Sequence, residues 1–322
     1  MCVWSPKKAR GCNGRQVDRY RRPDQCGRQS GYREPIFNDM MTLDEHLEAY
    51  KADGFTVFRG YLTPEQVQQW RSQMDAEFPE LFAATPERAR ARIVPLLGHE
   101  KLAPLAKEHV QNSLMLDFAE RVMGPYVQLD SFEASGFPCR DGDLKGAVDR
   151  WHRDAFHNSE MWAEFQTMAE QSPRLYTPPL ACNCLTYLQE MNEETGPLRV
   201  LKGSHLEYVT IAKEDERKPH PQEVFLDLQA GDMVFTHHEL LHSGTWNISQ
   251  EIRYFLSVYL CRIGLPHRDT FDLPAIHQLQ ADARRQQDRR LLRLFGEDHL
   301  FMSREEESWR QMVQQDQAAL VR

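Results

Sequence analysis

Hydrophobic positions recur with a helical period early in the chain. Thr42 precedes apolar residues at helical spacing, which predicts that its hydroxyl caps a helix starting at residue 43. Thr63-Pro64 predicts a second helix, with threonine as the cap and proline in the first turn. Residues 112–122 are amphipathic and precede Gly124-Pro125, so a third helix is expected there.

From residue 126 onward the pattern changes to that of strands. Short segments alternate between apolar and polar residues, or are rich in β-branched and aromatic residues, and turn residues separate them. The predicted strands are 54–58, 126–132, 181–188, 223–228, 233–236 and 254–260. Helices followed by many strands indicate an α+β domain with a closed or sandwiched antiparallel sheet.

Composition narrows the functional classes. With 322 residues, 41% of them hydrophobic, the chain can form one sizeable core. A net charge of −9 argues against general nucleic-acid binding, which needs a concentrated basic surface. The sequence contains neither an apolar run of transmembrane length nor the apolar region of a secretory signal. Seven cysteines without regular spacing indicate reduced thiols, so a cytoplasmic protein is expected. The expected partner is a small molecule.

Charge divides the chain into segments. Residues 1–34 hold nine Lys or Arg and three Asp or Glu, so we predict a basic, disordered leader over residues 1–39, with organelle targeting as the alternative. The catalytic domain is expected over 40–270. Residues 271–322 are predicted to form a helical extension that packs on the domain or makes a subunit contact in an oligomer; it includes a capping box at 303–306.

The strongest chemical signal is Trp151-His152-Arg153-Asp154. On a strand, residues i and i+2 project from the same face, so His152 and Asp154 can bind one ion. Alone the pair is a weak metal hint, since such pairs also occur as simple hydrogen-bonded pairs. A second imidazole from His242 would complete the two-histidine, one-carboxylate set that leaves coordination positions open in non-haem Fe(II) oxygenases.

Several motifs around these residues support that chemistry together. They are Asp53-Gly54-Phe55, the ligand motif itself, Gly196-Pro197-Leu198-Arg199-Val200, Gly203-Ser204-His205 and Ala230-Gly231-Asp232. On these motifs the chain resembles, over roughly residues 43–262, the phytanoyl-CoA dioxygenase family of Fe(II)/2-oxoglutarate oxygenases. Lys202 departs from the proline that is common before the glycine in that family, which affects only a turn.

The resemblance implies a double-stranded β-helix, or jelly roll, with flanking helices. It also implies that His152, Asp154 and His242 are the iron ligands and that Arg253 binds the far carboxylate of 2-oxoglutarate. The interval of eleven residues before Arg253 matches the family and selects His242 over His237 and His238, which are expected to be ordinary polar residues.

The sequence around Arg253 agrees with this role. A lone arginine in an apolar strand is costly unless it meets an anion, although a surface arginine paired with an acid is the alternative. Gln128 and Thr186 are expected as secondary contacts to the cosubstrate, with ordinary sheet residues as the alternative reading.

The expected reaction is oxidation, most simply hydroxylation, of an unactivated carbon in a small or medium organic molecule, with release of succinate and CO2. Fe(II) is the implied metal, 2-oxoglutarate and O2 are cosubstrates, and ascorbate is a candidate activator. Apolar residues within 155–179 predict either a short helix packed on the domain or a lid that covers a partly apolar substrate. Asp154 argues against halogenation, since halogenating relatives carry a small residue there. The alternatives are an inactive barrel that binds a ligand and a zinc hydrolase using the same three ligands.

Overall fold

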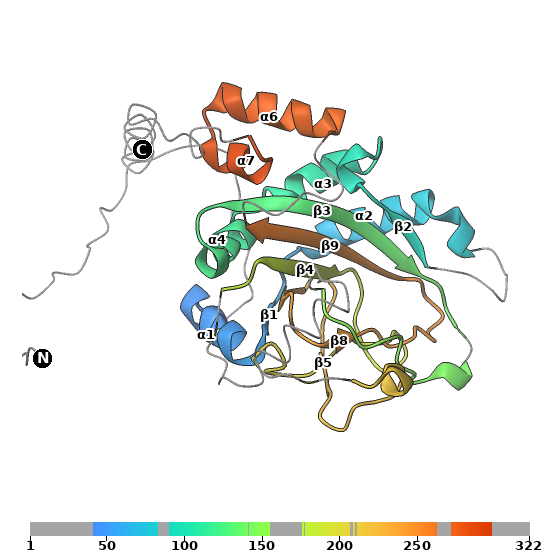
Figure 1. Cartoon of the computed structure of the whole chain (residues 1–322). Coiled ribbons are helices and arrows are strands. Elements are labelled where there is room, and N and C mark those ends of the chain that lie inside the picture. Colours follow the sequence, from blue (N-terminus) through green and yellow to red (C-terminus); the bar gives the residue numbers. More distant parts are fainter. Residues whose placement is uncertain are drawn as a thin grey trace, which may run out of the picture. The chain divides into compact units, whose positions relative to one another are not determined.

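The computed structural model describes residues 41–82, 90–140, 142–154, 176, 178–206, 209, 211–262 and 272–297. All of these belong to one unit of the chain, residues 35–322 (Figure 1). The predicted basic leader and the predicted capping box at 303–306 lie outside the described residues, as does most of the segment 155–179.

Two antiparallel sheets form the centre of the described fold. The large sheet has six strands in the order β1 (Phe55–Phe58), β7 (Met233–His237), β4 (Ala181–Tyr187), β9 (Arg253–Arg262), β3 (Val127–Phe137) and β2 (Ala91–Ile93). The small sheet has the order β6 (Val224–Phe225), β5 (Arg199–Val200) and β8 (His242–Ser243). The expectation of an α+β fold with sandwiched antiparallel sheets is therefore confirmed.

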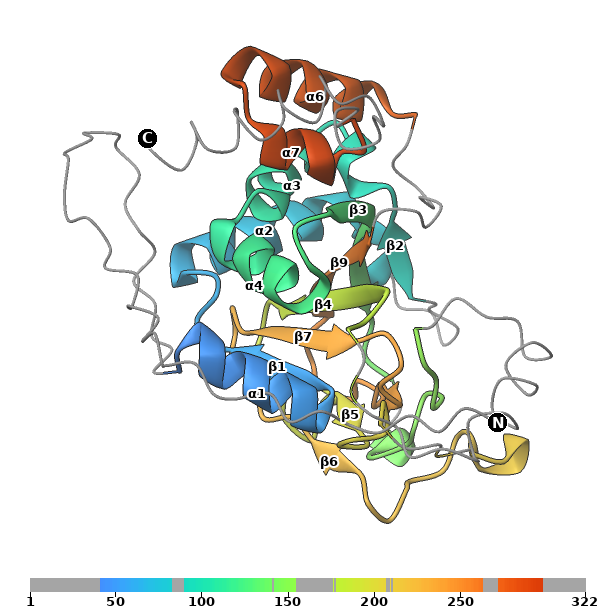
Figure 2. The same ribbon diagram turned by 60° about the vertical axis from the view of Figure 1, so that its left-hand side comes forward.

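Helices cover one side of the large sheet. They are α1 (Leu43–Asp53), α2 (Pro64–Glu77), α3 (Ala103–Val110), α4 (Ser113–Met123), α6 (Pro274–Gln286) and α7 (Arg289–Leu294). Figure 1 shows α2, α3, α4, α6 and α7 on one side of this sheet and β5 and β8 on the other. Figure 2 shows α1 alongside β1. Thr42 and Thr63 cap α1 and α2 as predicted, each within a capping box, and Asn112 caps α4.

The strands of the large sheet are buried on both faces. Tyr254, Leu256 and Val258 of β9 join the apolar core beneath the helices, whereas the alternate residues face the small sheet. Ten of the eleven residues of β3 are buried. Alternation between apolar and polar residues therefore does not separate an inner face from a solvent face here, because helices cover one face and the small sheet covers the other.

Several boundaries differ from those expected. The predicted strand 223–228 is ordered as a strand only at Val224–Phe225, and neither β2 nor α3 was predicted. In the predicted C-terminal extension, α6 and α7 contribute apolar side chains to the same core as the other helices. None of the described helices is long and apolar enough to span a membrane.

Candidate active site

Two short backbone segments bring the predicted histidines together. His152 and His242 form an antiparallel bridge in which each backbone N–H donates to the other residue's carbonyl at 3.0 Å. The two imidazole rings consequently lie side by side, with centroids 4.3 Å apart. A single pair of backbone hydrogen bonds thus sets the spacing of both histidines, although 89 positions separate them in the sequence.

Asp154 completes a compact set of donor atoms. Its Oδ1 lies 3.7 Å from Nε2 of His152, and its Oδ2 lies 3.8 Å from Nε2 of His242. Within the described part of the chain, these three residues form the group whose ligand atoms all lie within 4.8 Å of one another. Two imidazole nitrogens and one carboxylate on a common face are suited to a divalent transition metal with open coordination positions.

The protonation of both histidines also suits a metal. Nδ1 of His152 lies 2.9 Å from the carbonyl of Arg150, and Nδ1 of His242 lies 3.0 Å from the carbonyl of Leu240. Because a carbonyl only accepts hydrogen bonds, each Nδ1 carries the proton and each Nε2 keeps its lone pair. Burial and the neighbouring His242 lower the pKa of His152, which further favours the neutral ring.

A polar network fixes the carboxylate of Asp154. The Asn183 amide donates to Oδ2 of Asp154 at 3.0 Å, and Ser257 donates to the amide oxygen of Asn183 at 2.7 Å. Burial raises the pKa of Asp154, but the two histidines and the hydrogen bonds from Asn183 and Tyr259 outweigh that effect and lower it. The carboxylate is therefore held both ionised and oriented.

Arg153, which lies between the two ligands of the motif, anchors the segment from the opposite side. Its guanidinium donates to the carbonyls of Glu239 at 2.8 Å and of Val209 and Ser204 at 3.2 Å. Alternation along the extended segment thus directs Arg153 toward neighbouring loops while His152 and Asp154 face the cavity.

Arg253 is the buried cation at the other end of the site. Its Nη1 donates to the carbonyls of Thr195 at 3.2 Å and Thr245 at 2.7 Å, and its guanidinium lies over the Phe137 ring at 4.4 Å. Its buried Nε has no hydrogen-bond partner among the described residues. Burial lowers the pKa of Arg253 to about 10, so the side chain remains a cation at neutral pH. Arg253 is thus a buried cation with an unsatisfied donor, and its side chain lines the cavity described below.

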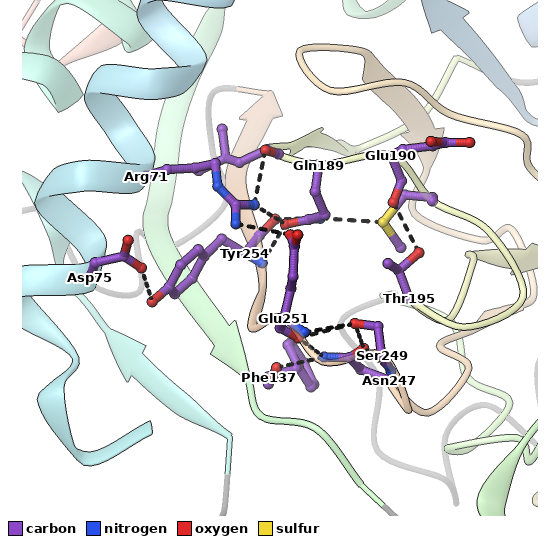
Figure 3. Close-up of polar contacts among 12 residues, drawn as sticks. Arg71, Asp75, Phe137, Gln189, Glu190, Thr195, Asn247, Ser249, Glu251 and Tyr254 are labelled. Atoms are coloured by element: carbon purple, nitrogen blue, oxygen red, sulfur yellow. Dashed lines mark hydrogen bonds and ion pairs between the residues drawn. The ribbon is translucent and has the colours of Figure 1, made fainter. Parts of the chain in front are cut away.

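The backbone beside Arg253 is clamped by side chains (Figure 3). The amide of Gln189 accepts from the Tyr254 N–H at 2.8 Å and donates to the Tyr254 carbonyl at 3.0 Å. Asn247 donates to the carbonyls of Phe137 at 3.1 Å and Glu251 at 2.7 Å. These bonds hold β9 where its pairing with β4 ends, so the position of Arg253 is set from both sides.

A cavity of about 120 Å³ connects the two ends of the site. His152, Asp154, His242 and Arg253 all line it. The other lining residues are Arg90, Glu133, Phe137, Asp149, Asn183, Leu185, Tyr187, Gly196, Leu198, Gly244, Phe255, Ser257 and Tyr259. The structure therefore brings together the three expected metal ligands and the expected cosubstrate arginine around one cavity.

Gln128 and Thr186 do not line this cavity. Gln128 lies near the start of β3, whereas the cavity residues of that strand, Glu133 and Phe137, lie toward its other end. Thr186 points away, because Leu185 and Tyr187 on either side of it face the cavity. Their role as secondary contacts to the cosubstrate stays a prediction.

Sequence reasoning missed the polar residues that surround the ligands, namely Asn183, Ser257 and Tyr259, and the charged pair Arg90 and Glu133. Asn183 carried a usable signal, because an amide in the middle of a buried apolar strand needs a polar partner. The others depend on strand register, which becomes visible only in three dimensions.

The fold and this ligand set define the class of Fe(II)- and 2-oxoglutarate-dependent dioxygenases. The model of the phytanoyl-CoA dioxygenase (PhyH) family matches residues 50–255, so the chain belongs to that family. It is 24% identical over 214 residues to the Fe(II)/2-oxoglutarate-dependent dioxygenase nvfF of Aspergillus novofumigatus, covering 62% of this chain and 65% of that protein. It is 23% identical over 246 residues to the ectoine dioxygenase of Bordetella parapertussis, covering 68% and 74%.

Solved structures share the fold. HygX from Streptomyces hygroscopicus, solved with nickel, 2-oxoglutarate and hygromycin B bound, superposes with a TM-score of 0.53 at 16% identity, covering 69% of this chain and 88% of that one. AviO1 from Streptomyces viridochromogenes Tue57 superposes with a TM-score of 0.50 at 16% identity, covering 71% and 99%.

Proposed function

We propose that this protein catalyses 2-oxoglutarate-dependent oxidation, most simply hydroxylation, of an unactivated carbon in a small or medium organic substrate, with release of succinate and CO2. The observation that supports it best is the joint geometry of the cavity. Three metal-ligand atoms lie within 4.8 Å of one another, and the buried cation Arg253 lines the same cavity.

Each residue has a defined task in this proposal. His152, Asp154 and His242 would hold Fe(II), which when bound supplies the activation of O2 coupled to decarboxylation of 2-oxoglutarate. Arg253 would hold the far carboxylate through its guanidinium and so orient the cosubstrate toward the metal ligands. Leu185, as one of the apolar walls, would exclude water and receive a partly apolar substrate.

The test is anaerobic addition of 2-oxoglutarate to the protein loaded with Fe(II), followed by exposure to O2. We expect a visible absorption band before oxygen is admitted and succinate afterwards, with ascorbate increasing the yield. Absence of both would support a barrel that only binds ligands. Arg253→Ala distinguishes the oxygenase from a zinc hydrolase built on the same three ligands. The hydrolase reaction does not require Arg253, so its turnover would be retained in this variant.

A further inference from the structure

A second charge cluster lines the same cavity, apart from the three proposed metal ligands. Its Arg90 shares the Phe137 ring with Arg253, since the two guanidinium groups lie 5.0 and 4.4 Å from that ring. Glu133 on β3 is almost fully buried and pairs with both Arg90 and Arg92, and the Ser135 hydroxyl donates to it at 3.0 Å. Glu133 and Arg90 line the cavity, whereas Arg92 does not. The proposed chemistry at the metal uses none of these residues.

Arg90 is held in a fixed orientation. Its Nε and Nη2 donate to Ser135 at 3.2 and 2.7 Å, and Nη2 also pairs with Glu133. Its guanidinium lies over the rings of Phe137 and Phe255, at 5.0 and 5.5 Å. Among the described residues, no acceptor bonds to its Nη1. A preorganised guanidinium with an unused donor is suited to an oxyanion.

Strand register places this guanidinium beside the proposed cosubstrate path rather than on it. Along β9 the path from Asp154 to Arg253 passes Tyr259, Ser257 and Phe255, since Tyr259 bonds to Asp154. Glu133 is the cross-strand neighbour of Ser257, on the side of β9 away from β4. Because β9 separates β3 from β4 and neighbouring strands lie about 4.8 Å apart, the Glu133 backbone lies roughly 10 Å from β4, whose Asn183 holds Asp154.

Asp149, another acid that lines the cavity, does not offset the suitability of Arg90 for an anion. Asp149 lines the cavity, but half of its side chain is exposed and it pairs with Arg217 at 3.7 Å. Glu133 already accepts from three donors, so it positions Arg90 and offers little to a ligand. The unused donor capacity at this end of the cavity belongs to Arg90.

We propose that Arg90 binds a carboxylate of the organic substrate, so that the substrate class is an organic acid whose oxidised carbon lies several bonds from its carboxylate. This assignment rests on the proposed function. The aromatic rings of Phe137 and Phe255 and the apolar wall at Leu185 and Leu198 would contact the rest of that molecule. Arg90 is thus a specificity-determining residue for the proposed reaction.

The test uses octanoate and 3-phenylpropanoate, each compared with its primary amide, as probes of the full-length protein loaded with Ni(II) and saturating 2-oxoglutarate. Saturation-transfer NMR would measure binding. We expect each acid to bind about tenfold more tightly than its amide, as for a charge-assisted hydrogen bond. Arg90→Gln should abolish this preference and Arg90→Lys should restore part of it. Arg92→Gln, which removes the other partner of Glu133 outside the cavity lining, should largely retain it.

Three results would overturn the assignment: no acid binds, acids and amides bind equally, or Arg90→Gln behaves like Arg92→Gln. Loss of 2-oxoglutarate affinity in Arg90→Gln would also overturn it, because Arg90 would then belong to the cosubstrate site. Failure of the wild-type protein to bind Ni(II) with 2-oxoglutarate at all contradicts the proposed function instead, so the two failures are distinguishable.

Discussion

Asn183 offers the sharpest test of how the metal ligands are held. Its amide donates to Asp154 at 3.0 Å, an ordinary hydrogen-bond length, and receives a hydrogen bond from Ser257 at 2.7 Å. Asn183→Leu keeps a similar volume and removes both interactions. Loss of a hydrogen-bonding partner of a ligand typically weakens metal binding about 10–100-fold. Because Tyr259 still bonds to Asp154, we expect the metal affinity to fall about tenfold, or about 1.4 kcal/mol.

The assay is competition for Ni(II) against a chromophoric chelator, with circular dichroism to confirm that the variant is folded. Ser257→Ala is the matched control, since Ser257 reaches Asp154 only through Asn183. We expect it to weaken binding about threefold, with no further loss when it is combined with Asn183→Leu, because residues in one network do not act additively. Unchanged affinity in a folded Asn183→Leu protein, or additive losses in the double variant, would refute the reasoning.

Three further predictions follow from the structure. Arg253→Gln should raise the KM for 2-oxoglutarate at least about tenfold while Ni(II) affinity stays unchanged, since the proposed role of this guanidinium is to bind the cosubstrate and not the metal. Equal losses of both would contradict this. Gly196→Ala should lower the yield of folded protein and raise the KM for 2-oxoglutarate. The φ angle of Gly196 is +82°, and the added Cβ would lie 2.5 Å from the Thr245 carbonyl and 2.7 Å from Arg253. Wild-type thermal stability and an unchanged KM would refute this. His109 is buried, and neither ring nitrogen has a hydrogen-bond partner among the described residues. Burial lowers its pKa to about 3. The stability that depends on the neutral ring is therefore complete above the ordinary histidine pKa near 6.5 and is lost as the pH falls toward 3. His109→Phe should remove about 2 kcal/mol of the stability difference between pH 7 and pH 5, measured by urea unfolding, and an equal difference in both proteins would argue against this origin.

The proposed metal ligands and Arg253 could be predicted because the sequence patterns that indicate them do not depend on how the strands pair. His152 and Asp154 are two positions apart, so any extended conformation places them on one face. The interval from His242 to Arg253 matched a family pattern, and the structure brings all four residues to one cavity. The capped helices were predictable for a related reason, because Thr42 and Thr63 act through neighbours within one helical turn.

The choice of face along the buried strands could not be predicted. In β4 the residues Asn183, Leu185 and Tyr187 face the cavity and Cys182 and Cys184 face the helices, yet all five are buried. A strand that is covered on both faces carries no alternation of polarity, so its phase is not visible in the sequence. For this reason the sequence alone does not distinguish Thr186 from Asn183, although only Asn183 lines the cavity.

The two ends of the cavity are built from elements of different rigidity. Arg253 belongs to β9, a ten-residue strand that pairs with β3 on one side and β4 on the other, and Gln189 extends that pairing past the end of β4. His152 and His242, in contrast, share one isolated bridge, and β8 is two residues long. The proposed cosubstrate anchor is therefore held by the sheet itself. The metal end depends on side-chain bonds, from Arg153 on one side and Asn183 on the other, to keep three donor atoms within reach of one ion.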